Sequence, residues 1–145
     1  MNRYAYSVFC DDIRQEINGK ITMVGIYTNR LLVTSVPTVL PKLCLALSIA
    51  TDKSSMFEEI SVTGTFGADE VFKMELQKEQ IEGIIAQSPD AESPAKFFTV
   101  QLNAILTPFQ LQHTGKLSLK VLADGEELEC AGLEMALAPP GTVIL

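Results

Sequence analysis

The sequence predicts an all-β protein: one antiparallel β-sandwich domain over residues 1–145, with about eight strands and at most one short helix. Three observations support this class. Apolar and polar residues alternate with period two over most of the chain, turn-forming residues separate the alternating stretches, and only one stretch has helical spacing. A partly closed barrel is the second choice.

Composition limits the classes of function. The chain is 47% hydrophobic, which is too rich for disorder, and its 145 residues fit one domain with a sizeable core. A net charge of -7 disfavours binding to nucleic acid or to anionic membranes. No apolar run is long enough to span a bilayer and no secretory signal begins the chain, so we expect a cytoplasmic protein.

The opening residues predict two strands joined by a charged corner. Alternation covers Tyr4 to Cys10 and again Lys20 to Tyr27, and Asn18-Gly19 predicts a turn between them. The intervening segment, Asp11 to Glu16, is rich in charged groups. We expect an aspartate there to cap a single helical turn, with Gln15 or Glu16 reaching back to it.

The next stretches predict a short edge strand at 31–34, a crossing segment at 35–40 and a long strand from Leu43 to Ala50. Two nearby prolines, Pro37 and Pro41, argue against a helix in the crossing segment. In the long strand, leucine and isoleucine occupy one face and small residues the other. This pattern predicts a half-buried strand.

The middle of the chain predicts a hairpin and then the one helix. Strands at 60–66 and 71–76 flank a turn at 67–69, and residues 77–87 place Ile81, Ile84 and Ile85 on one helical face. The following segment, Ser88 to Pro94, is the most loop-like of the chain, and the stretch 77–94 is long enough to bridge two sheets.

The final third predicts a strand at 97–106 and a closing hairpin. Alternation at 117–121 is followed by Asp124-Gly125, a strong hairpin signal, and by a return strand at 127–137. The apolar tail, residues 142–145, either packs on its own sheet or pairs with the edge of another chain.

Catalytic signals are missing, so we expect a protein that is not an enzyme and has no cofactor. The lone histidine, His113, lies in a predicted turn, no serine stands in a G-x-S-x-G elbow, and neither glycine-rich phosphate-binding pattern occurs. A catalytic pair of His113 with a cysteine distant in the sequence remains an alternative. The odd number of widely spaced cysteines predicts small buried side chains and no disulfide framework.

The acidic loops raise the alternative of a calcium site, although we expect no bound metal. Their carboxylates would have to gather at one end of the sandwich. Capping or solvated carboxylates explain the same residues, and no loop has a D-x-D run. The residues concerned are Asp11, Asp12, Glu16, Asp52, Asp69, Glu70 and Asp124.

The corner supplies the candidate binding residues. We select Asp11, Asp12, Arg14, Glu16 and Lys20, because acid and base are densest there and binding groups concentrate on loops. The alternative is that the same side chains only stabilise the local turn.

The opening also resembles an uncharacterised family of small bacterial and phage proteins. The resemblance lies in Phe9-Cys10-Asp11-Asp12-Ile13-Arg14-Gln15-Glu16, in Asn18-Gly19-Lys20-Ile21 and in Gly25-Ile26-Tyr27, with similarity at Leu40-Pro41-Lys42-Leu43 and in the last hairpin. It implies a one-domain, mainly-β cytosolic protein of bacterial or phage origin. Because the family has no known activity, it assigns no functional residue.

These observations favour a non-enzymatic protein-interaction module, such as a phage or prophage accessory protein that acts on a host component. The first alternative is a structural subunit that assembles with itself into a homo-oligomer or phage particle. The second is a sandwich that binds calcium or a small ligand. The expected partner is therefore a protein or a second copy of the chain.

Overall fold

The computed structural model describes residues 2–87 and 96–142. Twelve strands lie in these ranges, one α-helix follows β7, and a 3₁₀ turn, η1 (Ile17–Gly19), follows β1. The strands are β1 (Tyr4–Gln15), β2 (Ile21–Tyr27), β3 (Arg30–Val33), β4 (Thr38–Leu40), β5 (Leu43–Asp52), β6 (Ile60–Phe66), β7 (Asp69–Leu76), β8 (Phe97–Leu106), β9 (Phe109–Leu111), β10 (Gly115–Ala123), β11 (Glu126–Leu128) and β12 (Leu133–Leu137).

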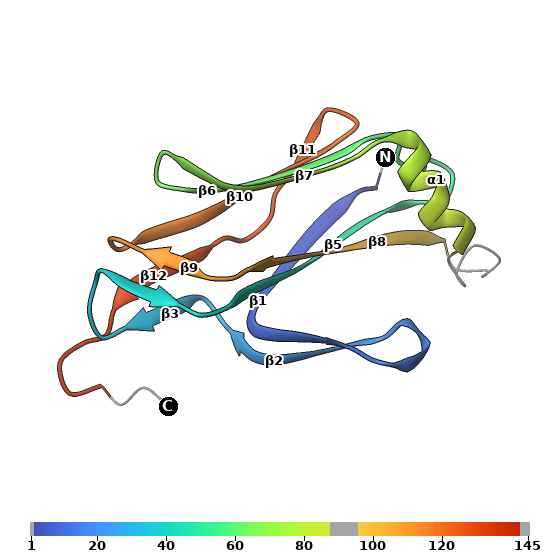
Figure 1. Ribbon diagram of the computed structural model, residues 1–145. Helices are drawn as coiled ribbons and strands as arrows, with labels where there is room; N and C mark the ends of the chain where they lie inside the picture. The colour runs from blue at the N-terminus through green and yellow to red at the C-terminus, as the bar shows by residue number, and fades with distance from the viewer. Residues whose placement is uncertain (1, 88–95, 143–145) are drawn as a thin grey trace.

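Two larger sheets form most of the molecule (Figure 1), and β4 pairs with β9 in a third sheet of two strands. The first sheet has the order β2-β1-β5-β8; the second has the order β3-β12-β10-β6-β7, with β11 beside β10. Pairing is antiparallel except between β12 and β3. The predicted all-β class is confirmed. The strands outnumber the expected eight mainly because β4, β9 and β11 have three residues each, too few for alternation to mark them.

The core lies between the two sheets. Leu45 and Leu47 of β5 are buried on one side, and Val62, Leu117 and Val121 are buried on the other. Burial of an apolar side chain of this size contributes about 1.5–3 kcal/mol, so this layer is the main source of stability. Alternation in β6, where every second residue is buried, matches this arrangement.

The predicted corner is wrong, because β1 continues as a strand through residues 11–15. The end of β1 pairs with β2 in a hairpin that includes Ile13 opposite Met23 and Arg14 opposite Thr22. This pairing satisfies the backbone groups that a capped helical turn would otherwise satisfy. The predicted turn is confirmed, since Asn18 and Gly19 have φ of 70° and 75°.

The long strand β5 is buried on both faces, so the prediction of a half-buried strand is wrong. Residues 43–51 are all buried, although Cys44, Ala46 and Ser48 belong to the outward face. The strand lies between β1 and β8, and their larger side chains flank its small ones. Ser48, for example, lies between Tyr6 of β1 and Gln101 of β8. Its Oγ donates a hydrogen bond to Gln101 Oε1 at 2.6 Å.

The predicted return strand is also divided. Its two parts, β11 and β12, are separated at Gly132, where a Cβ atom would lie 2.3 Å from the Leu117 carbonyl oxygen. The chain therefore approaches β10 too closely there for any larger residue. The predicted hairpins are confirmed: β6 pairs with β7, and β10 pairs with β11 around Asp124-Gly125.

The helix α1 (Lys78–Gln87) connects the second sheet to the first, as the sequence predicts. Ile81 is buried, and Ile84 and Ile85 pack against the core. The Gln77 backbone N–H donates to Gln80 Oε1 at 2.8 Å, a cap of the first turn. No helix in the described ranges is long and apolar enough to cross a membrane. The expected loop at 88–94 and the tail beyond Thr142 lie outside the described residues.

A buried arginine joins the start of β1 to the second sheet. The Arg3 side chain is 3% exposed, and its Nη2 lies 2.8 Å from Asp124 Oδ2. Its Nε donates to Thr51 Oγ1 at 3.1 Å, its Nη2 to the Ser55 carbonyl at 3.1 Å, and its guanidinium lies 5.0 Å from the Phe57 ring centre. Arg3 therefore connects segments far apart in the sequence.

Candidate functional site

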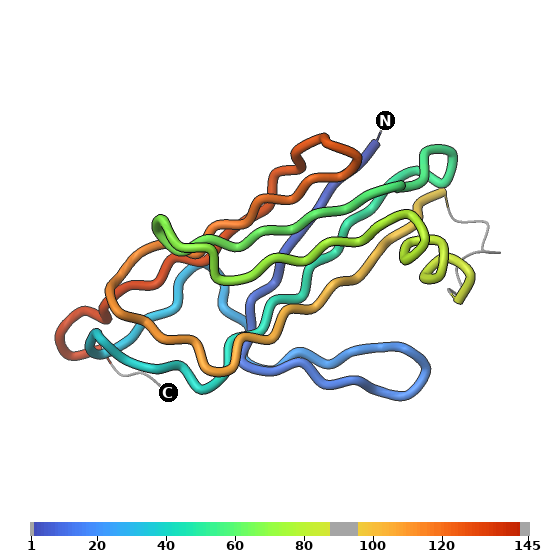
Figure 2. Tube along the Cα trace, turned by 45° about the horizontal axis from the view of Figure 1, so that its top comes forward, coloured from blue at the N-terminus to red at the C-terminus, as the bar shows by residue number. Residues whose placement is uncertain are grey.

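The hairpin of residues 11–26, here called the arm, projects from the body. Among the described strands, β2 pairs only with β1, and no residue from 11 to 27 is buried. Figure 1 and Figure 2 both show the arm standing away from the two sheets. All five candidate binding residues lie in this arm.

The arm leaves the body at a bend built around Asp11. Gly25, the residue opposite Asp11, has a φ of 69°, and a Cβ atom on it would lie 2.2 Å from Asp11 Oδ2. Tyr27 Oη donates a short hydrogen bond to Asp11 Oδ1. Burial and this hydrogen bond raise the pKa of Tyr27 well above its usual value of 10.0. Asp11 is therefore a structural element of the bend, because its carboxylate holds Tyr27.

Asp12 is held by a lysine from the body. Lys42 Nζ lies 2.6 Å from Asp12 Oδ1; this hydrogen bond lowers the pKa of Asp12 and raises that of Lys42. Below the bend, the Cys10 thiol donates to the Asp12 carbonyl at 3.4 Å, and the Cys44 thiol to the Asp11 carbonyl at 3.8 Å. Burial raises the pKa of both thiols.

The remaining candidates lie further out along the arm. Arg14 is opposite Thr22, while the Glu16 backbone N–H donates to the Lys20 carbonyl at 2.8 Å near the tip. All three side chains are exposed, and among the described residues none of them forms an ion pair. The five candidates thus share one arm but do not converge on one point.

The arm also presents apolar side chains to solvent. Ile17 at the tip is 81% exposed, and Val24 and Ile26 of β2 are 47% and 55% exposed. A two-stranded hairpin without a packed face is marginally stable in water. An arm with exposed isoleucines and free charges therefore has the composition of a contact element, in which apolar anchors are surrounded by polar groups.

The outward face of the first sheet, here called the outer face, is a second exposed surface. From Tyr4 to Cys10 of β1 and across β5 and β8, its positions carry one charged side chain, Asp52, which pairs with Phe97 at one end of the face. Tyr4 and Tyr6 are half exposed and stacked with ring centres 6.4 Å apart, and Phe97 meets Tyr4 edge-on at 6.3 Å. The positions on this face are Tyr4, Tyr6, Val8, Cys10, Cys44, Ala46, Ser48, Ala50, Asp52, Phe97, Thr99, Gln101, Asn103 and Ile105.

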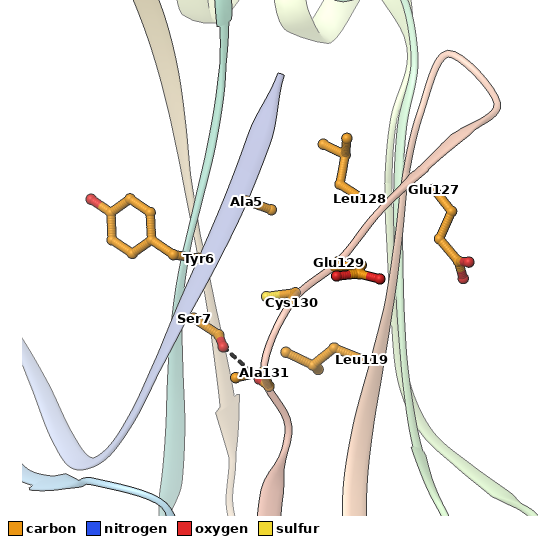
Figure 3. A pocket seen from close by; sticks show the side chains of 9 residues that line it. All are labelled: Ala5, Tyr6, Ser7, Leu119, Glu127, Leu128, Glu129, Cys130 and Ala131. Carbon is orange, nitrogen blue, oxygen red and sulfur yellow. Dashed lines mark hydrogen bonds between the residues drawn. The ribbon is translucent and has the colours of Figure 1, made fainter. Parts of the chain in front are cut away.

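A groove of about 670 Å³ opens at the side of the sandwich, between β1 and the segment that follows β11 (Figure 3). Leu119 and Leu128 contribute apolar side chains to it, and Cys130 points across it toward β1. Ser7 Oγ donates to the Ala131 carbonyl at 2.5 Å, which joins the two walls at one end. Burial raises the pKa of the Cys130 thiol.

The acidic loops do not gather at one end, so that premise of the calcium alternative is wrong. Asp124 lies beside the Ile60 end of β6, because Ala123 pairs with Ile60, whereas Asp69 pairs with Phe66 at the other end. Among the described residues no group of three or more histidine, cysteine or carboxylate side chains is placed to hold a metal ion.

The lone histidine takes part in packing. Its ring stacks on Phe66 with centres 5.1 Å apart, and its Nδ1 lies 2.9 Å from the Thr114 carbonyl oxygen. His113 therefore sits beside an aromatic ring of the second sheet, and neither of these contacts is with a cysteine.

Comparison with known proteins identifies a family and no function. A family model described as a family of unknown function, DUF6941, matches residues 5–136. The chain belongs to this family. No curated protein and no solved structure matches the chain. The match covers the arm, the groove and all of the outer face except Tyr4, and it assigns a role to none of them.

Sequence reasoning missed three residues that position the arm. Tyr27, Lys42 and Gly25 all contact the predicted Asp11-Asp12 pair, two of them from across the hairpin. A usable signal existed for Gly25: an isolated glycine inside a strand pattern indicates a bend or a close approach. Nothing in the sequence indicated Lys42, because its contact depends on how β5 begins beside the bend.

Proposed function

We propose that the protein is a non-enzymatic protein-interaction module whose arm, residues 11–26, contacts a protein partner. The observation that carries this proposal is that the arm projects from the body without a single buried residue, yet exposes Ile17, Val24 and Ile26. Exposed apolar side chains rimmed by polar ones are typical of protein contact sites.

The charges of the arm suit the same role. Asp11 and Asp12 are held at the base, so the bend fixes where the arm points. Arg14, Glu16 and Lys20 are exposed toward the tip and form no ion pair within the described residues. Charges at the rim of an interface contribute to orientation and selectivity more than to affinity.

A photo-reactive amino acid at Ile17 tests the proposal in protein expressed in its native host. We expect an adduct of one discrete additional mass, and no such adduct from the same probe at Lys73, a control position on β7. A variant with residues 13–23 replaced by Asn-Gly should melt close to the wild type, because no residue of the arm is buried. Equal labelling at both positions would contradict the proposal.

A double variant separates recognition from local structure. Asp12→Ala with Arg14→Ala should leave the melting temperature within a few degrees of the wild type and weaken the Ile17 adduct. A fall of many degrees would show that these side chains serve the fold alone. The resemblance to small bacterial and phage proteins supports a cytoplasmic accessory protein of a phage or prophage that acts on a host component.

The weakly charged outer face favours a second candidate function, a self-assembling subunit. Two chains that each carry a charge of -7 repel one another least through a face with few charges, and this face carries one, Asp52, at its end. Native mass spectrometry distinguishes the two functions. A dimer or larger assembly that Tyr6→Lys dissociates would favour self-assembly, whereas a monomer that forms the Ile17 adduct would favour the interaction module.

A further inference from the structure

Half of β1 has an open edge. The strand pairs with β5 from Tyr4 to Cys10, but β2 pairs with it only from Phe9 onward. Over Tyr4–Val8 no strand of the described chain lies on the other side. Alternate residues of an antiparallel strand direct their N–H and C=O groups to each side, so this edge presents backbone donors and acceptors.

The groove described above runs along this edge. Ala5, Tyr6 and Ser7 form its first wall, and residues 127–131 form the second (Figure 3). A strand added beside β1 would occupy the place that β2 leaves empty. Every second side chain of that strand would then point toward Leu119, Leu128 and Cys130, where a volume of about 670 Å³ is available.

The second wall of the groove is acidic. Glu129 is exposed at the groove, and Glu127 lies on the same wall and points outward (Figure 3). Neither carboxylate forms an ion pair among the described residues. The net charge of -7 also attracts cations and disfavours a second copy as the occupant.

We propose that this edge and groove bind an extended, basic peptide segment of a protein partner by strand addition to β1. Backbone hydrogen bonds to Tyr4–Val8 would hold the segment, apolar side chains would enter the groove, and a lysine or arginine would lie near Glu129. The inference rests on the proposed function of an interaction module and adds a contact surface separate from the arm.

A fluorescein-labelled heptapeptide in which valine alternates with lysine tests the proposal with the full chain. We expect saturable binding by fluorescence anisotropy at low salt, and a weakening of about twofold to fivefold in Glu129→Gln, the range of an exposed ion pair. Glu75→Gln, a matched change on the far edge of the second sheet, should leave the affinity unchanged. Bound peptide should also slow alkylation of Cys130.

A second peptide, methylated at every backbone amide, keeps the side chains but loses its backbone N–H donors. We expect it not to bind, and we expect the unmethylated peptide to protect amides of Tyr4–Val8 from hydrogen exchange. Equal binding of both peptides, or protection confined to other strands, would overturn the proposal. The variant without the arm should bind the peptide normally, so this proposal and the role of the arm fail independently.

Discussion

Replacing Arg3 by methionine should destabilise the protein severely, although the residue lies near the N-terminus, just before the first strand. The substitution keeps an apolar stem of similar length and removes the guanidinium. Asp124 then loses its ion pair at 2.8 Å and keeps only the Glu58 and Glu59 backbone N–H donors. The Ser55 carbonyl loses a donor as well.

The magnitude follows from burial. Breaking a buried ion pair costs about 3–5 kcal/mol, because one charge stays behind without its partner. Asp124 is 28% exposed, which places the expected loss toward the lower end, about 3 kcal/mol. For a chain of this size we expect Tm to fall by about 10 °C.

Urea denaturation followed by fluorescence or circular dichroism measures this change. Arg30→Met is the matched control, since Arg30 and Glu134 are both about half exposed and lie 3.5 Å apart. That pair should contribute less than about 1 kcal/mol. Arg3→Lys keeps the positive charge and should lower the free energy of unfolding by less than Arg3→Met does. If Arg3→Met and Arg30→Met cost the same, the Arg3 pair does not hold the sheets together.

Three further predictions concern titration, thiols and the bend. In a spectrophotometric titration at 295 nm, the difference between the wild type and Tyr27→Phe should show Tyr27 ionising only well above pH 10, because its pKa is raised. Tyr27 of the unfolded chain ionises near pH 10, so the stability that the Tyr27–Asp11 hydrogen bond contributes should be fully present below that pH and fall above it. Ionisation of Tyr27 below pH 10 in the folded protein would contradict the bend geometry. At pH 8 the native protein should react with a thiol reagent far more slowly than the unfolded protein, and half-buried Cys130 should be modified before the two buried thiols. Peptide mass mapping that found Cys10 or Cys44 modified first would refute this order. Gly25→Ala should lower the free energy of unfolding by about 1–2 kcal/mol in denaturant titrations, because alanine disfavours a positive φ. It should also lower the pH at which Tyr27 ionises, because the new Cβ displaces the Asp11 carboxylate that accepts the Tyr27 hydrogen bond. An unchanged Tyr27 titration would show that Asp11 does not need the space that Gly25 leaves.

The parts of the fold that were predictable are those with local causes. The hairpin of β6 and β7, the Asp124-Gly125 turn and the helix with buried Ile81 all follow from spacing within a few residues. The apolar–polar alternation of β1 continues through Ile13, which lies between two polar residues. The many charged residues around Ile13 made this alternation hard to recognise. The charged corner was therefore predicted where a strand continues.

The five candidate binding residues were chosen from the sequence, which did not show how they are arranged in space. Sequence alone determined that this is an all-β protein, because the alternation of apolar and polar residues is a local property. Tertiary structure decided that residues 11–26 project as an arm, that Lys42 holds Asp12, and that Arg3 reaches Asp124 on the other sheet. These features depend on which strands become neighbours. Which strands pair depends on the burial of the whole core, and no short stretch of sequence contains that information.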